Sequence, residues 1–241
     1  MILYVTTPIC YSSEERIEYF RKYIDHVNRL NNLNKIHFLF FVEPNSENMV
    51  DMIPNHWNKT IFRNYYRFKP SLNHYVAFNY CFDVLKLEFT LLLEDDIIVS
   101  PDIYNLIKYC LNSDSLDENA LCLLNKHKLF NPSHNIYSIN SKELLIQIND
   151  VKYLSCWGVG ISNKFWQNVL KNRWSMNISF DSNLDLNFKT CGVITPVVSR
   201  ANQIGKIGFN YTESIWDSHG FVNIKIENNY TENLYRIEKI D

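Results

Sequence analysis

The stretch LLLEDDIIVSPD, residues 91–102, places three acids, Glu94, Asp95 and Asp96, directly behind three leucines. The leucines belong to a short apolar run, which is typical of a buried strand in an α/β sheet. A buried strand cannot continue into three carboxylates unless water or a cation meets them. The acids therefore mark the end of the strand, and the sequence leaves open which of the two they meet.

The segments around this strand alternate between strand and helix patterns. Residues 2–7 and 36–43 favour strands, and the apolar residues between them recur at spacings of three and four, which predicts a helix. Residues 70–85 predict another helix, and residues 119–125 predict another strand. This alternation predicts a mainly parallel sheet with right-handed crossovers and helices on its faces. We expect residues 1–241 to form a single α/β domain.

The second half of the chain is less regular. Residues 126–150 favour a loop with a hairpin, residues 163–171 a helix, and the segment from Asp181 a further helix. Residues 193–198 favour a short strand.

The composition limits the classes of function. The net charge is only −2 and no Lys/Arg-rich run occurs, so we expect no nucleic-acid partner. The chain shows neither a signal-peptide pattern nor an 18-residue apolar span, so we expect a soluble, cytoplasmic protein without a transmembrane segment. The six cysteines have no CxxC or zinc-site spacing and are expected to be free, buried thiols.

Three acids at a strand end are chemically suited to a cation. Ligands bind at the carboxyl ends of the strands in an open parallel sheet. Adjacent carboxylates repel each other, and oxygen ligands favour Mg²⁺ or Mn²⁺ with water and substrate phosphates completing the shell. The sequence has no GxxxxGK[ST] or GxGxxG loop, so a metal-bridged diphosphate is the natural interpretation of the acids. A solvated acidic turn is the alternative.

Six segments follow one another in an order that we know from one group of enzymes. HYVAFNYCF resembles a helix reading HYxxAL, LLLEDDIIVSPD an acidic strand end, and NALCLLN the next strand. CWGVGISNKFWQNVLKNRW resembles a segment with GLGW, FDSNLDLNF a WDDWMR helix, and GVITPVVSRANQIGKIG a segment reading RPExSRTxxFGxxG. The chain thus resembles nucleotide-sugar glycosyltransferases of the GT-A fold, most of all the N-acetylglucosaminyltransferase I group (family 13), with a further likeness to bacterial family 2-type transferases.

The resemblance implies a fold and an activity. The fold is GT-A, a Rossmann-like, mixed and mainly parallel sheet flanked by helices in a single domain. Residues 1–125 would bind the nucleotide sugar, and residues 126–241 would carry the acceptor and catalytic groups. The activity is a metal-dependent, inverting transfer of a sugar, in the first place N-acetylglucosamine (GlcNAc), from a UDP-sugar to a hydroxyl of a carbohydrate or glycan acceptor.

The resemblance also implies roles for individual residues. Asp96 would bind Mn²⁺ or Mg²⁺ directly, and His219 is a candidate second ligand. Asp181 would be the catalytic base, with Asp185 as its rival. The implied donor contacts are Glu94 and Asp95 to the sugar and ribose, His74 to the uracil, Glu43 near the uridine, and Phe180 facing the sugar. Two further candidates come from the residues themselves: Trp157, beside Gly158, could face a sugar ring or pack in the core, and Arg200 could pair with a phosphate or the acceptor, or cap a helix end.

The chain also departs from this family. The turn after the first strand lacks the arginine that the family places against the uridine, GLGW is replaced by CWGVG, and WDD is replaced by FDS. These departures favour the alternative of a catalytically degenerate GT-A domain that binds a nucleotide sugar or glycan without transfer. A metal-dependent nucleotidyltransferase or phosphohydrolase is a third possibility, but it would need a Gly-rich loop or a Lys/Arg cluster early in the chain.

Overall fold

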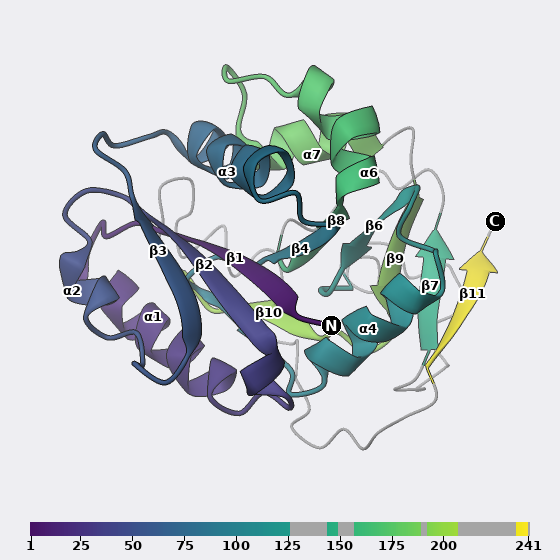
Figure 1. Cartoon of the computed structure of the whole chain (residues 1–241), viewed down its shortest axis with the longest axis horizontal. Coiled ribbons are helices and arrows are strands. Elements are labelled where there is room, and N and C mark those ends of the chain that lie inside the picture. Colours follow the sequence, from purple (N-terminus) through teal and green to yellow (C-terminus); the bar gives the residue numbers. More distant parts are fainter. Residues whose placement is uncertain (126–143, 149–156, 189–191, 207–234, 241) are drawn as a thin grey trace.

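The computed structural model describes residues 1–125, 144–148, 157–188, 192–206 and 235–240, with side chains left out for 185–188 and 238–240. Nine strands form the main sheet in the order β11-β7-β9-β6-β8-β4-β1-β2-β3, and β10 pairs with β5 in a second, two-stranded sheet (Figure 1). The strands are β1 (Leu3–Ile9), β2 (Ile36–Val42), β3 (Asn58–Arg63), β4 (Phe89–Leu92), β5 (Ile97–Val99), β6 (Asn119–Cys122), β7 (Leu144–Ile148), β8 (Val159–Ser162), β9 (Gly192–Pro196), β10 (Ala201–Gln203) and β11 (Arg236–Ile240).

The main sheet is mixed and mainly parallel. The pairs β1–β2, β2–β3, β1–β4, β6–β9 and β7–β11 are parallel, whereas β8 runs antiparallel to both β4 and β6, and β7 runs antiparallel to β9. The predicted fold class is therefore confirmed. The strand expected at residues 119–125 is shorter than predicted, and most of the hairpin expected at residues 126–150 lies outside the described residues.

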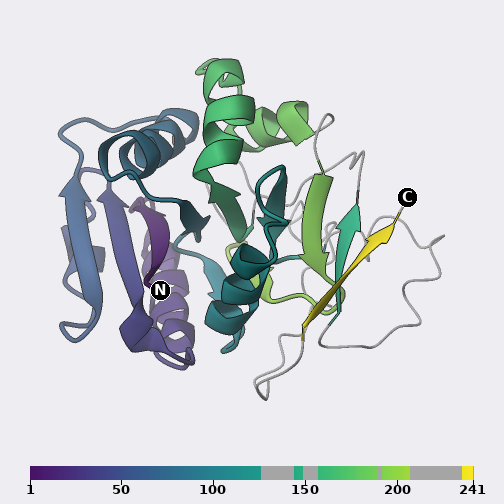
Figure 2. The same ribbon diagram turned by 45° about the vertical axis from the view of Figure 1, so that its right-hand side comes forward.

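The helices lie on both sides of this sheet. They are α1 (Glu14–Val27), the short α2 (Glu47–Val50), α3 (Pro70–Asn79) with a π-helical turn (Tyr80–Val84), α4 (Ile103–Asn112), α6 (Asn163–Phe165) with its continuation through Arg173, and α7 (Phe180–Phe188); a short 3₁₀ turn spans Leu33–Lys35. In Figures 1 and 2, α3, α6 and α7 lie together above the sheet, and α1 and α4 lie below it. None of the described helices is long and apolar enough to cross a membrane.

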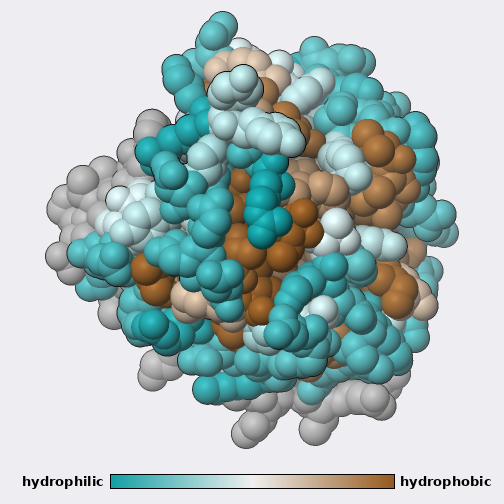
Figure 3. Space-filling model, turned by 60° about the vertical axis from the view of Figure 1, so that its left-hand side comes forward, coloured by the Kyte–Doolittle hydropathy of each residue, from teal (hydrophilic) through white to brown (hydrophobic). Residues whose placement is uncertain are grey.

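Aromatic packing joins the helices above the sheet. Trp166 is fully buried and contacts Phe78, Phe82 and Trp174, with ring centroids 5.6–6.0 Å apart. Aromatic side chains bury the largest areas of any residue type, so this cluster fixes α3 against the segment that leads into α7. In the space-filling view of Figure 3, hydrophobic residues gather in a central hollow of one face, and hydrophilic residues surround it.

The register of three central strands places their carboxyl ends at one edge. Leu92 of β4 pairs with Thr6 of β1, and Ile9 of β1 pairs with Val42 of β2. Since the three strands are parallel, the residues that follow them converge at the same edge of the sheet. This is where the acidic triplet leaves β4.

Candidate functional site

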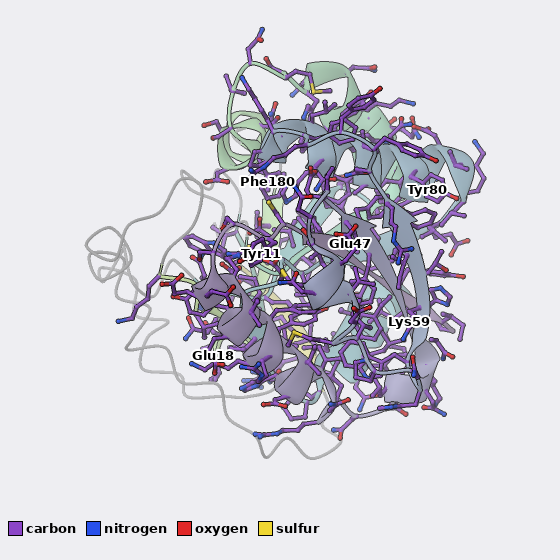
Figure 4. All side chains as sticks on the ribbon, turned by 90° about the vertical axis from the view of Figure 1, so that its left-hand side faces the viewer. Tyr11, Glu18, Glu47, Lys59, Tyr80 and Phe180 are labelled. Carbon is purple, nitrogen blue, oxygen red and sulfur yellow. The ribbon has the colours of Figure 1, made fainter. Side chains whose placement is uncertain are left out.

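A cleft of about 170 Å³ lies at the carboxyl ends of β1, β2 and β4. Figure 4 shows Phe180 of α7 above Tyr11, whose chain neighbours Cys10 and Ser12 line the cleft. The cleft is lined by Pro8, Cys10, Ser12, Arg16, Glu43, Arg67, Phe68, Pro70, Asn73, His74, Glu94, Asp95, Asp96, Trp157, Phe180, Asp181 and Gln203. The structure thus brings together most of the site residues expected from the sequence.

Arg16 is the cation that the last two acids of the triplet meet in this structure. One terminal nitrogen of its guanidinium donates to Asp96 Oδ2 at 2.7 Å, and the other bonds Asp95 Oδ1. The backbone N–H of Cys10 lies 3.4 Å from Asp95 Oδ2 and also donates to it. Asp95 and Asp96 are only 1% and 4% exposed, so in this structure a cation, and not bulk water, meets them.

Arg16 is not among the site residues expected from the sequence. The turn after the first strand was expected to lack an arginine, but Arg16 stands in the first turn of the following helix, α1, and lines the cleft. The available signal was its position: Arg16 lies in the first turn of the helix that follows β1, and β1 is the parallel neighbour of β4, so this helix begins close to the residues that follow β4.

A glycine packs directly on the triplet. The backbone N–H of Ile204 donates to the carbonyl of Asp96 at 3.0 Å. A Cβ atom on the adjacent Gly205 would lie 2.0 Å from Asp96 Oδ2, which no real contact allows. The pairing of β10 with β5 brings this segment to the acids, and a larger residue at position 205 would require the Asp96 side chain to move.

Glu43 follows β2 and holds the loop before α3. Its Oε2 accepts from the backbone N–H of Phe68 at 2.8 Å, and its Oε1 accepts from Asn64 Nδ2 at 3.2 Å. Burial raises the pKa of Glu43 above its usual value, and the Phe68 and Asn64 hydrogen bonds oppose this rise only in part. Both carboxylate oxygens of Glu43 thus accept hydrogen bonds from the protein itself. The uridine contact expected of this residue stays a prediction.

His74, a residue of α3, packs against α7. Its Nδ1 lies 2.6 Å from the Pro70 carbonyl, which can only accept, so Nδ1 carries the proton. Its Nε2 lies 3.3 Å from Glu94 Oε1. The imidazole stacks on Phe180 with centroids 3.8 Å apart, so the ring face toward Phe180 cannot stack on the uracil ring of a nucleotide.

Asn183 fixes the start of α7, which carries Asp181. Its fully buried amide accepts from the Ser175 backbone N–H at 2.7 Å and donates to the Ser175 carbonyl at 2.8 Å and to Ser71 Oγ at 3.0 Å. These bonds place Asp181 at the cleft, where its side chain is exposed. Asp185 lies in the same helix, but its side chain is outside the described residues, as is the whole of His219.

Arg200 is not among the residues that line the cleft. It is fully buried, and its Nε donates to Asp102 Oδ2 at 2.9 Å. The same carboxylate accepts from Ser100 Oγ at 2.6 Å and from the Tyr235 hydroxyl at 3.0 Å. A phosphate contact through Arg200 does not fit this arrangement, because its guanidinium is already paired with Asp102. This pair holds the segment before β10 against the Pro101-Asp102 turn.

The cleft is acidic, and its acids fit a partial metal site. Five carboxylates line it against two guanidiniums. Within the described part of the chain, no group of three or more His, Cys, Asp or Glu side chains could hold a metal ion. Mg²⁺ and Mn²⁺ are commonly bound by one or two carboxylates with substrate phosphates and water. Asp95 and Asp96, two buried carboxylates that already face one cation, fit a site of that kind.

Solved glycosyltransferases are similar to this chain in fold. TarS residues 1–349 of S. aureus superimpose with a TM-score of 0.53 at 11% identity, over 83% of this chain and 60% of that one. The mannosyltransferase PcManGT of Pyrobaculum calidifontis, in complex with GDP-Man and Mn²⁺, gives 0.52 at 11% identity, over 90% of this chain and 60% of that one. The galactosyltransferase LgtC, with donor and acceptor sugar analogues, gives 0.50 at 12%, over 80% and 73%.

These similarities confirm the GT-A fold, with a single domain built on a mixed, mostly parallel sheet. The chain spans about 60% of the length of the TarS and PcManGT chains. No protein-family model and no curated protein sequence matches the chain.

Proposed function

We propose that this chain is a metal-dependent, inverting glycosyltransferase that moves GlcNAc from UDP-GlcNAc to a hydroxyl of a carbohydrate or glycan acceptor. The observation that carries the proposal is the convergence of Glu94, Asp95, Asp96 and Asp181 in one cleft of a GT-A fold. These residues come from two segments more than 80 positions apart in the sequence. The choice of UDP and GlcNAc rests on the resemblance of the sequence segments to the N-acetylglucosaminyltransferase I group.

The charge of the cleft supports a need for a cation. A nucleoside diphosphate brings two or three negative charges to a site that already holds an excess of carboxylates, which would repel it. Asp96, with Asp95 beside it, would hold Mn²⁺ or Mg²⁺ together with the diphosphate oxygens. Such a cation supplies positive charge where the leaving diphosphate gains negative charge.

The remaining steps fall to side chains of the chain itself. Asp181 would accept the proton of the acceptor hydroxyl, which is a poor nucleophile while it keeps that proton. A base on the side of the sugar opposite to the leaving group gives inversion of configuration, as in inverting sugar hydrolases. Phe180 and Trp157 line the same cleft and would exclude water around the sugar.

The test is a thermal-shift titration with UDP-GlcNAc, UDP-Gal, UDP-Glc and GDP-Man, each with and without Mn²⁺. We expect the largest rise in Tm with UDP-GlcNAc plus Mn²⁺, and loss of the metal-dependent part in Asp96→Asn. Transfer assays on Asp181→Asn and Asp185→Asn then identify the catalytic base. Only replacement of the base should lower the rate of transfer while leaving donor affinity unchanged. Absence of any shift with all four donors would refute the proposal.

One observation favours a second function, that of a degenerate domain which binds nucleotide sugar or glycan without transfer. The acids that would hold the metal are paired with Arg16 in this structure. Donor binding that is independent of Mn²⁺, with neither transfer nor donor hydrolysis, would support this alternative and count against the enzyme.

A further inference from the structure

Arg16 occupies the carboxylates that the proposed function assigns to a cation, and the inference drawn here rests on that function. The guanidinium contacts Asp95 and Asp96 with two different nitrogens. The Arg16 side chain is 13% exposed, and the side chains of Asp95 and Asp96 are 2% and 6% exposed. The three groups form a two-pronged ion pair that is largely shielded from water, and such charge-assisted pairs are among the strong polar contacts in proteins.

A guanidinium and a divalent cation compete for the same pair of carboxylates. Arg16 already bonds one oxygen of each acid, and a metal ion held by the same two carboxylates would lie within a few ångströms of its positive charge, so the two cations would repel each other. A metal ion added alone therefore binds only the fraction of molecules in which Arg16 has left the acids. The apparent dissociation constant rises in inverse proportion to that fraction.

We propose that Arg16 is a resident counter-ion that competes with the divalent cation for Asp95 and Asp96, so that the metal binds weakly until a nucleoside diphosphate arrives with it. Arg16 lies in the first turn of α1 and lines the cleft itself. When it leaves the acids, its charge therefore remains beside the ligand, where it can bind phosphate oxygens. The competition makes the binding of metal and the binding of diphosphate mutually dependent, because each favours the same released state of Arg16.

The test measures Mn²⁺ binding to metal-stripped protein in the absence of nucleotide, by the electron paramagnetic resonance signal of free Mn²⁺. Arg16→Gln should bind Mn²⁺ at least tenfold more tightly than the wild type. The double variant Arg16→Gln/Asp96→Asn should lose that gain, which assigns it to the acidic pair. Unchanged or weaker Mn²⁺ binding in Arg16→Gln would overturn the proposal.

Arg21→Gln is the matched control. Arg21 lies on the same helix and is also paired with a carboxylate, that of Glu18, but it is 57% exposed and does not line the cleft. Its variant removes the same charge from α1 and should bind Mn²⁺ as the wild type does. A gain of equal size in Arg21→Gln would trace the effect to net charge and would also overturn the proposal.

Arg16→Lys covers the case in which the glutamine variant does not fold. A lysine keeps the charge but cannot grip two carboxylates in the forked geometry of a guanidinium. Its Mn²⁺ affinity should exceed that of the wild type, and equality with the wild type would contradict the proposal.

A titration with UDP in EDTA and in Mn²⁺ separates this inference from the proposed function. Cooperative binding of UDP and Mn²⁺ in the wild type, reduced in Arg16→Gln, supports both. If no protein binds Mn²⁺ under any condition while UDP still binds, the competition is refuted and nucleotide binding stands. If UDP never binds but Arg16→Gln gains Mn²⁺ affinity, the competition stands and the proposed function fails.

Discussion

The imidazole of His74 lies face to face with the ring of Phe180, with centroids 3.8 Å apart and planes inclined by 14°. This stack joins α3 to α7 and sets one wall of the cleft, since both residues line it. It also joins the two halves of the chain, so the shape of the cleft depends on how α7 is held.

Two substitutions of Phe180 should distinguish its packing in the core from the stack of its ring on His74. Phe180 is 3% exposed, so Phe180→Ala should lower the free energy of unfolding by about 3–5 kcal/mol. Phe180→Leu should recover most of that loss, but not the stack on His74. We therefore expect both variants to bind UDP-GlcNAc more weakly than the wild type, as measured by calorimetry. Full donor affinity in Phe180→Leu would show that the stack does not contribute to donor binding.

The buried pair of Arg200 and Asp102 should be important for stability. Arg200→Met leaves Asp102 uncompensated in the interior, which typically costs about 3–5 kcal/mol and should appear as a lower urea midpoint. Lys164→Ala is the control: it breaks a pair with Asp117 whose side chains are both more than half exposed, and the midpoint should not move. Equal midpoints for the two variants would contradict this account.

Gly205 should be required for the acidic site. In Gly205→Ala the new methyl group would overlap Asp96, so we expect a loss of Mn²⁺-dependent donor binding of at least tenfold. Gly160→Ala offers a comparison, because its Cβ would meet Phe89 at 2.5 Å, away from the cleft. That variant should lose stability but keep donor affinity in its folded fraction. Normal donor binding by Gly205→Ala would mean that Asp96 is free to shift.

The thiols should react in an order set by burial. Burial raises the pKa of Cys81 to about 11 and that of Cys110 to about 12. Only the thiolate is nucleophilic, and at pH 8 roughly one Cys81 thiol in a thousand is ionised, so neither residue should be alkylated in the folded protein. Raising the pH toward 11 should increase their ionised fraction and hence their reactivity, as long as the fold persists.

Cys10 should behave differently, because it is partly exposed and lines the cleft. We expect N-ethylmaleimide to modify Cys10 at pH 8, and UDP with Mn²⁺ to protect it. Mass spectrometry of the peptides measures both effects. Modification of Cys10 at the same rate with and without saturating nucleotide would place the ligand elsewhere.

The sequence by itself determined the architecture and much of the cleft. Apolar periodicity is a local property, so it predicted the strand before Glu94 and the helix 70–85, and the rule that parallel strands end at one edge brought the acids to a site. The resemblance of short segments then identified His74 and Asp181, which the structure places in the same cleft.

Only the tertiary structure decided which charges meet. Arg16 pairs with Asp95 across 79 positions and Arg200 with Asp102 across 98, and no local pattern distinguishes these arginines from solvated ones. The partner of a long, flexible cation depends on which element packs beside it, and on whether water is excluded there. For this reason Arg200 was expected in the site and Arg16 was not, whereas in the folded chain Arg16 lines the cleft and Arg200 pairs with Asp102 away from it.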